Sequence, residues 1–228
     1  MTQIASLRSK VLESLDRGKK LCYFVRDAAP QREQRNELRL IKDEVPKAKE
    51  LVLTNNEDIA NELLALELML EAQAQELEMW LALKDSRAAD AWENLISAQD
   101  AARSAVRAHR LGEMLERSQE RLHVMEKILF PPQLFFSIGA IVRESTCSIC
   151  DSPYGECDHI KGRAYAGKIC SRIISKAEVR EVSIVDDPAN KRCRVLEITE
   201  GGIARDYLTW APIQKSVDQD PGNDGAGA

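Results

Sequence analysis

The chain has 228 residues, of which 44% are hydrophobic, 30% charged and 5% aromatic. This length suits one large domain or two modest ones, and the hydrophobic content is sufficient for a buried core. The formal net charge of −5 argues against a general binder of nucleic acid or anionic membranes, because both need a basic surface.

Membrane and export signals are not found in the sequence. No stretch reaches the ~18 apolar residues that span a bilayer. The first six residues lack the charged start and long apolar run of a signal peptide. We therefore expect a cytoplasmic protein without membrane contact. In that reducing compartment, six cysteines indicate a metal site or buried thiols rather than disulfides.

Residues 1–130 are predicted to be helical, because apolar residues recur there at spacings of three, four and seven. The first helix is expected to end at Pro30. Its apolar face comprises Ile4, Leu7, Val11, Leu15, Cys22 and Val25. A second helix is predicted over residues 31–53, with a kink at Pro46.

Two longer helices are predicted to follow. Residues 54–57 form a capping signal for a helix with a near-heptad apolar seam. That seam comprises Ile59, Leu63, Leu66, Leu70, Leu77 and Trp80. Asp85 and Ser86 offer a cap for a last helix over residues 87–129. Two long helices joined at a turn predict an antiparallel hairpin, so the N-terminal domain is expected to be a coiled-coil-like helical bundle. A coiled coil that dimerises or binds a partner is the alternative.

Pro131 and Pro132 break the helix, and the apolar period then falls to two. Strands are predicted over residues 134–142, 168–174, 179–185, 194–199 and 203–210. Residues 200–202 are expected to form a hairpin turn between the last two strands. The sequence therefore predicts a small antiparallel β domain over residues 131–214 and a disordered tail over residues 215–228. The expected fold class is α+β.

Three cysteines and a histidine lie close together in the β half: Cys147, Cys150, Cys157 and His159. Zinc prefers four nitrogen or sulfur ligands in a tetrahedron, and a closed Cys3His set is typical of a structural site. The turn-forming residues 151–155 are suited to folding the second pair onto the first. We therefore predict a zinc knuckle holding one structural Zn²⁺. Buried thiols beside a surface histidine are the alternative.

The remaining cysteines are interpreted as small buried hydrophobic residues. Cys22 lies on the apolar face of a helix, and Cys170 and Cys193 lie in or beside predicted strands. Either of the last two could replace His159 as a ligand. A catalytic zinc is not expected, because four protein ligands leave no open position and no HExxH-type base is present.

The β half also resembles a known family. The run Cys-Ser-Ile-Cys-Asp-Ser-Pro-Tyr-Gly-Glu-Cys-Asp-His-Ile-Lys-Gly, followed by residues 181–190, resembles the C-terminal part of tailed-phage prohead (capsid-maturation) serine proteases. In that family a strand ending in Ser-x-Gly precedes a Glu-Val-Ser strand and a Pro-Ala-Asn turn. Some members carry a cysteine-rich insertion between them. The match covers roughly residues 134–193, with Ser137 and Gly139 at the first element.

The resemblance implies that Ser137 stands at the nucleophile position of a serine endopeptidase. A serine hydroxyl needs a neighbouring base, usually histidine. The family supplies that histidine from a strand upstream of the serine, whereas His109 and His123 here lie in a predicted helix. We therefore interpret the chain as keeping the zinc-containing β module without the protease.

The sequence thus predicts a non-enzymatic zinc-binding interaction or assembly protein, of phage or prophage origin by the resemblance. Its helices are expected to bind a protein partner or to self-associate. One alternative is a prohead-type protease that uses Ser137. The other is a zinc-knuckle nucleic-acid binder, with bases stacking on Tyr154 and Tyr165. Its basic residues would be Lys161, Arg163, Lys168 and Arg172.

Overall fold

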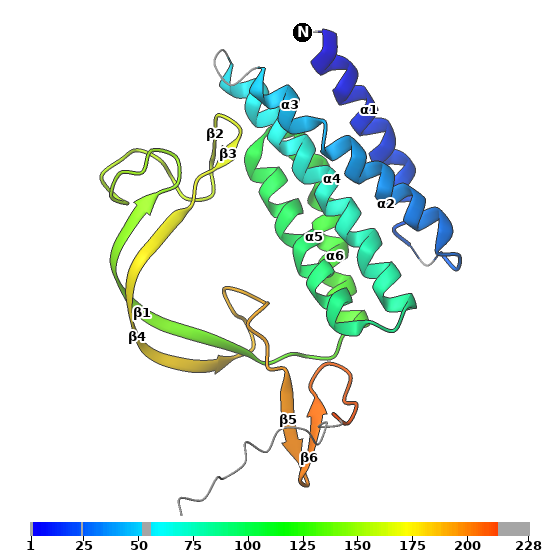
Figure 1. The fold of residues 1–228 in the computed structure, drawn as a ribbon, viewed down its shortest axis with the longest axis vertical. Coiled ribbons are helices and arrows are strands. Elements are labelled where there is room, and N and C mark those ends of the chain that lie inside the picture. Colours follow the sequence, from blue (N-terminus) through cyan, green and yellow to red (C-terminus); the bar gives the residue numbers. More distant parts are fainter. Residues whose placement is uncertain (1, 24, 52–55, 214–228) are drawn as a thin grey trace, which may run out of the picture.

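The structure, a computed structural model, describes residues 2–23, 25–51 and 56–213. It is α+β, as predicted, with the helices first and small antiparallel sheets after them (Figure 1). The helices are α1 (Thr2–Lys19), α2 (Ala29–Lys42), α3 (Val45–Glu50), α4 (Glu57–Lys84), α5 (Ala88–Ala108), the 3-10 helix η1 (Arg110–Leu115) and α6 (Glu116–Leu129). The strands are β1 (Phe135–Cys147), β2 (Ala164–Tyr165), β3 (Lys168–Ile169), β4 (Arg172–Val185), β5 (Glu197–Glu200) and β6 (Ile203–Asp206).

Among the described residues, no helix is both long and apolar enough to cross a membrane. The tail predicted to be disordered, residues 215–228, lies outside the described part of the chain.

Helix α4 is the centre of the bundle and contacts α1, α2, α3 and α5 (Figure 1). It begins at the predicted cap, where the Asn56 side chain accepts a hydrogen bond from the backbone N–H of Ile59 at 3.2 Å. Four consecutive residues, 63–66, are all buried. A single seam would bury only one side of a helix, whereas α4 is packed around most of its circumference because neighbours lie on several sides.

Several helix ends differ from the prediction. Pro30 and Pro46 lie in the first turns of α2 and α3, where the missing N–H costs nothing, so each proline begins a helix. Asp85 ends α4, and α5 begins after Arg87 without a side-chain cap. The last predicted helix is broken at His109, whose backbone is extended (φ −163°, ψ 153°).

Gly112 gives a physical reason for the break at His109. A Cβ atom at Gly112 would lie 2.0 Å from the carbonyl oxygen of Ala105, so only glycine allows η1 to pack this closely on α5. The His109 side chain then caps η1, accepting a hydrogen bond from the N–H of Leu111 at 3.2 Å.

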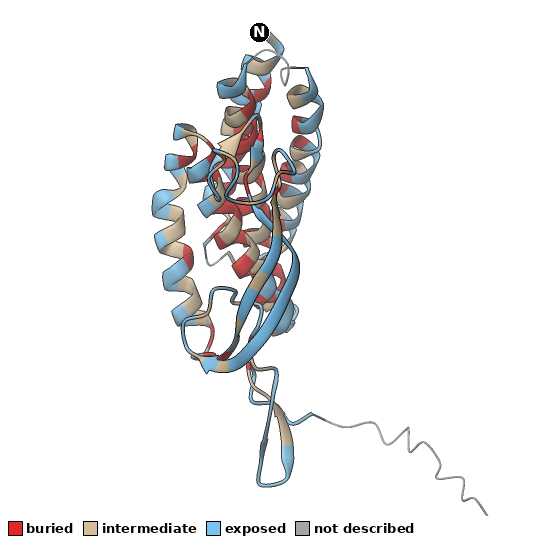
Figure 2. Ribbon diagram, turned by 90° about the vertical axis from the view of Figure 1, so that its left-hand side faces the viewer, coloured by how far each residue is buried: buried red, intermediate tan, exposed pale blue. Residues whose placement is uncertain are grey.

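Strands β1 and β4 form one long antiparallel hairpin, which we call the arm (residues 135–147 and 172–185). Two separate strands were predicted at 168–174 and 179–185, whereas residues 172–185 form a single strand in the structure. The arm leaves the bundle near the end of α6, bows outward and returns towards α4 and α5 (Figure 1). Most of its residues are exposed, while the helices behind it carry the buried core (Figure 2).

The root of the arm is fixed to the bundle by aromatic packing and an ion pair. Phe135 is buried, and its ring centroid lies 6.1 Å from that of Trp92 on α5. The Trp92 indole also contacts Phe130 edge to face at 5.4 Å and donates to the carbonyl of Lys191 at 3.3 Å. Lys191, in the turn after β4, pairs with Glu126 of α6 at 2.6 Å. The turn that contains the predicted Pro-Ala-Asn sequence is therefore held against the helices by the contacts of Lys191, the next residue.

We call residues 147–171, at the far end of the arm, the tip. Its short β2–β3 hairpin docks on the bundle. The backbone N–H of Gly167 donates to Asn61 Oδ1 of α4 at 2.8 Å. Ala164 and Ile169 pack against a small cluster that includes Leu64 and Ala108. The arm is thus attached to the bundle at both ends.

A last hairpin, β5–β6, projects beyond the bundle (Figure 1). Its turn is the predicted one, with positive φ at both Gly201 (58°) and Gly202 (79°), as a tight two-residue hairpin loop requires. Strand β6 ends at Asp206, earlier than predicted, because the Asp206 carboxylate accepts hydrogen bonds from the N–H groups of Leu208 and Thr209.

Candidate metal centre

The first pair of thiols lies on a tight turn that begins where β1 ends. The Cys147 N–H donates to the Ser152 carbonyl at 2.9 Å, and the Asp151 N–H donates to the Cys147 carbonyl at 2.9 Å. Asp151 takes a left-handed conformation (φ 59°), which short polar side chains tolerate better than most. These bonds close the loop, so that Cys147 and Cys150 lie on the same side of it.

The second pair, Cys157 and His159, comes from the loop that precedes β2. The His159 ring meets the Tyr165 ring edge to face, with centroids 4.7 Å apart. The Tyr165 hydroxyl accepts a hydrogen bond from the N–H of Ile160 at 2.9 Å. Tyr165 of β2 therefore orients both the imidazole and the loop that carries it.

The structure brings all four predicted ligands together. One donor atom from each of Cys147, Cys150, Cys157 and His159 lies within 4.8 Å of every other. Cys147 is buried, Cys150 is exposed and the other two are half-buried. The Nδ1 atom of His159 is buried and has no hydrogen-bond partner among the described residues, which costs free energy unless something else satisfies it. The cluster can hold a metal ion.

Backbone N–H groups surround the thiols. The Ile149 N–H points to Cys147 Sγ at 3.4 Å. Burial raises the pKa of Cys147, but hydrogen bonds from the N–H groups of Ile149 and Cys150 and from neighbouring thiols outweigh it and lower the pKa to about 7. Hydrogen bonds from the side chain and N–H of Ser152 lower the pKa of Cys150. Donors of this kind favour the thiolate, which is the form that binds metals.

Cys157 differs from these two. The His159 N–H lowers its pKa, but burial and the nearby thiols of Cys150 and Cys147 raise it more. Three thiols this close together disfavour simultaneous ionisation, and a bound cation would remove that repulsion.

A fifth sulfur, Cys170, lies beside the cluster. Its Sγ is 3.8 Å from Cys147 Sγ, and the side chain is buried. Burial raises the pKa of Cys170, with the Cys147 thiol adding to the effect. The prediction that Cys170 is buried is confirmed, and its place beside Cys147 keeps open the alternative in which Cys170 replaces His159 as a ligand. The Cys170 N–H, which donates to the Arg163 carbonyl at 2.8 Å, holds it there.

The other two cysteines lie elsewhere. Cys22 is buried as predicted, although in the turn after α1 rather than within a helix. Its neighbours are the Glu76 and Arg121 side chains, and burial followed by the Glu76 carboxylate raises its pKa. Cys193 is exposed, so the prediction that it is a core residue was wrong. It lies in the turn after β4, which the contacts of Lys191 hold on the helix surface.

The candidate nucleophile Ser137 lies near the root of the arm, two residues after Phe135, and pairs with Ser183 on β4. The three histidines of the chain are engaged elsewhere. His109 faces Asp58 at 3.5 Å, His123 faces Glu126 at 3.7 Å, and His159 belongs to the candidate metal cluster. None of the described contacts joins Ser137 to a histidine.

The residues considered for nucleic-acid binding are partly engaged. The Arg172 guanidinium lies over the Tyr154 ring at 5.3 Å, and Tyr165 contacts His159. Lys161 and Arg163 line an open hollow beside the tip, together with Arg107 of α5, which the sequence analysis did not single out.

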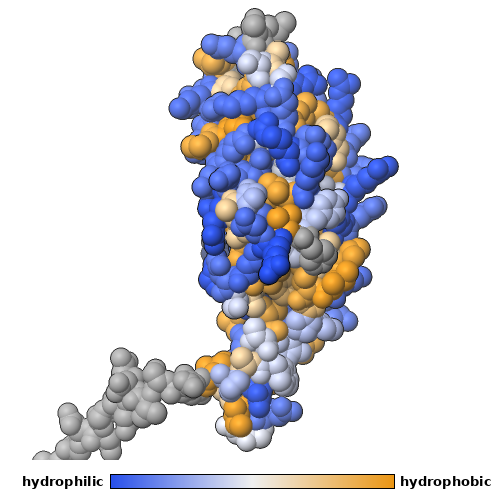
Figure 3. Space-filling view, turned by 90° about the vertical axis from the view of Figure 1, so that its right-hand side faces the viewer, coloured by the Kyte–Doolittle hydropathy of each residue, from blue (hydrophilic) through white to orange (hydrophobic). Residues whose placement is uncertain are grey.

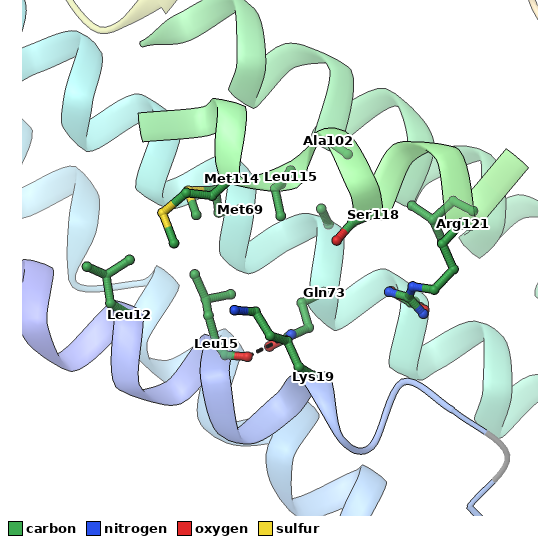
Figure 4. A pocket seen from close by; sticks show the side chains of 13 residues that line it. Leu12, Leu15, Lys19, Met69, Gln73, Ala102, Met114, Leu115, Ser118 and Arg121 are labelled. Carbon is green, nitrogen blue, oxygen red and sulfur yellow. Dashed lines mark hydrogen bonds and ion pairs between the residues drawn. The ribbon is translucent and has the colours of Figure 1, made fainter. Parts of the chain in front are cut away.

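A separate cavity lies within the bundle, between α1, α4, η1 and α6 (Figure 4). Its walls are mainly apolar, and Gln73 donates to the Leu15 carbonyl at 2.9 Å beside it. At about 40 Å³ it holds no more than a few water molecules. It is therefore too small for a substrate.

Comparison of the chain with protein-family models, with curated proteins and with solved structures finds no match. The resemblance of residues 134–193 to prohead proteases stays a prediction.

Proposed function

We propose that the chain is a non-enzymatic zinc-binding interaction protein, in which one Zn²⁺ fixes the tip and so holds the arm in place for a protein partner. The observation that carries the proposal is the cluster of three thiols and one imidazole, with donor atoms within 4.8 Å of one another. Sulfur-rich sets of four are typical of structural zinc, and thiolate and imidazole ligands together favour it over Ca²⁺ or Mg²⁺.

A structural role fits the composition of the tip. Strands β2 and β3 have two residues each, and much of the rest is turn or irregular backbone. So few buried apolar residues provide little folding free energy, and a metal ion supplies what the core does not. Zinc bound to Cys147, Cys150, Cys157 and His159 would join the end of β1 to the loop before β2.

The metal would also act at a distance from its ligands. The β2–β3 hairpin contacts α4 and α5 through Gly167, Ala164 and Ile169. A tip that keeps its shape keeps these contacts, and they fix the far end of the arm. This supports an interaction role, because a fixed and exposed arm is a surface that another protein can bind. The resemblance to prohead proteases supports a phage or prophage setting for that partner.

Metal analysis tests the proposal. We expect about one zinc per purified chain by inductively coupled plasma mass spectrometry, lost in Cys150→Ser and in His159→Ala. Cys193→Ser is the matched control, since Cys193 is exposed and outside the cluster. Hydrogen exchange of the zinc-free variants should speed up in residues 147–171 and much less in α4. A wild-type protein without metal, or tip exchange that does not respond to its loss, would overturn the proposal.

A further inference from the structure

The two faces of the arm differ sharply in chemistry. Residues 136, 138, 140 and 142 alternate along β1 and share one face. Their partners on β4 are residues 184, 182, 179 and 177, with a register shift between Gly139 and Ala140 at which β4 carries one extra residue, Arg180. We call this face the outer face. It comprises the cross-strand pairs Phe136–Ile184, Ile138–Val182, Ala140–Val179 and Val142–Ala177. All eight side chains are apolar.

The opposite face is more polar and better covered. It carries the pairs Ser137–Ser183 and Gly139–Glu181, in which Ser137, Gly139 and Ser183 are half-buried. At its root Phe135 packs in the core, with Val185 against the same cluster. The arm thus turns its polar face inward and its apolar face outward.

The register of the arm maintains this orientation. A slip of one residue would exchange the faces, but it would also remove Phe135 from its contacts with Trp92. The docked tip restrains the other end. The bundle therefore cannot cover the outer face without detaching one end of the arm.

Most of the outer face is exposed, and only Val142 among its eight residues is half-buried. The exposed fractions are 44% for Phe136, 62% for Ile138, 63% for Val179, 60% for Val182 and 62% for Ile184. A continuous apolar patch of this kind marks an interaction site. On the side of α1 and α2, the bundle surface mixes hydrophilic side chains with hydrophobic patches (Figure 3).

We propose that the outer face binds the outer face of a second copy of this chain. The five large side chains expose roughly 500 Å² of apolar surface, so two copies would bury roughly 1,000 Å², the lower limit for a specific interface. None of the eight paired side chains is charged, and the one cation at the register shift between them, Arg180, is paired with Glu178 at 3.0 Å. The paired residues therefore bring no like charges together when they meet an identical copy.

The geometry suits such a pair. Two identical faces related by a two-fold axis contact each other with the same residues. Two short sheets stacked face to face are the usual β-sandwich arrangement, with the apolar side chains interdigitating between them. The dimer would thus complete a two-layer core that a two-stranded arm cannot form alone.

This inference rests on the proposed function for the fixed arm, and its test is separate. Sedimentation equilibrium of the zinc-loaded full chain should give a mass that rises with concentration from 25.6 kDa towards twice that value. Ile138→Lys should shift the dimerisation constant at least tenfold towards monomer. Ile141→Lys is the matched control, because Ile141 lies on the opposite face, across from Glu178.

A second variant guards against misfolding of the first. Val182→Thr keeps β propensity but removes apolar area, so it should weaken the dimer several-fold with unchanged zinc content. Amides of residues 136–142 should also exchange more slowly as concentration rises. A zinc-loaded chain that stays monomeric up to high concentration, or a dimer unaffected by either outer-face variant, would overturn the inference while leaving the zinc proposal intact. A wild-type chain that does not retain zinc would refute only the zinc proposal.

Discussion

Cys147 Sγ and Cys170 Sγ lie 3.8 Å apart, but their pKa values move in opposite directions. That of Cys147 is lowered to about 7, while burial raises that of Cys170. Either thiol can donate in the metal-free pair, but once Cys147 binds a metal ion as the thiolate only Cys170 has a proton to donate towards the Cys147 sulfur. Groups that hydrogen-bond to metal ligands orient the ligand and tune the site without binding the ion themselves.

This pair gives a first prediction. Cys170→Ala should retain one zinc per chain, with an affinity about tenfold lower because the donor to Cys147 is lost. Cys157→Ala should lose the metal altogether. Competition with a chromophoric chelator measures both affinities. If Cys170→Ala loses the metal and His159→Ala retains it, Cys170 is the fourth ligand in place of His159.

A second prediction concerns the buried ion pair between α4 and α6. Arg121 donates to both carboxylate oxygens of Glu76, one bond being 2.7 Å long, and the Glu76 side chain is only 4% exposed. Arg121→Ala should destabilise the fold by about 3–5 kcal/mol, because it leaves a buried carboxylate unpaired. Urea unfolding measures the change, and Arg117→Ala, at an exposed site on the same helix, is the control. Equal free energies of unfolding for Arg121→Ala and Arg117→Ala would contradict this prediction.

A third prediction compares two adjacent phenylalanines. Phe135→Ala removes a side chain that is 3% exposed and should cost about 3–5 kcal/mol. Phe136→Ala removes one that is 44% exposed and should cost less than about 1 kcal/mol in the monomer. Thermal or urea unfolding at low protein concentration measures both. Similar losses of unfolding free energy in Phe135→Ala and Phe136→Ala would mean that Phe135 does not fix the root of the arm to the bundle.

A fourth prediction uses pH. Burial raises the pKa of Glu71, but hydrogen bonds from Lys42 and Gln75 lower it more, so the folded pKa lies below the ordinary value of 4.5. A lowered carboxylate pKa contributes stability above the unfolded pKa, and that stability is lost as pH falls through the folded pKa. Glu71→Gln should therefore cost about 0.5–1 kcal/mol at pH 7 and almost nothing near pH 3.

The control for that experiment is Glu13→Gln, at an exposed position on α1. Its unfolding free energy should match the wild type at both pH values. If Glu71→Gln lowers the free energy of unfolding as much at pH 3 as at pH 7, the charged contact with Lys42 is not the cause of the loss.

The types of the elements followed from apolar spacing, but their breaks did not. The period of α5 and α6 runs on through His109, and only the contact between Gly112 and Ala105 explains the interruption. Pro30 was predicted to end a helix and Pro46 to kink one, because a proline breaks the helical pattern in the same way whether it ends one helix or begins the next. Residues 175–178 looked like a gap between strands because β-bulges near Glu144 disturb the alternation there.

The candidate site was more predictable than its surroundings. The four candidate ligands share one short segment, so local spacing was enough to single them out. Cys170 comes close to Cys147 only because β4 begins opposite the end of β1. Arg107 reaches the tip from a helix more than fifty residues earlier, beside Gly162, which no local pattern reveals.

Because the arm is attached to the bundle at both ends, it is restrained more than a hairpin attached at one end only. A loosely attached hairpin would lose conformational entropy when a partner ordered it, whereas the restrained arm has already lost most of that entropy on folding. Its stiffness depends on residues that no partner touches, such as Trp92 at one end and Asn61 at the other. Substitutions at these remote positions should therefore weaken association by increasing the mobility of the outer face, without changing any side chain in that face.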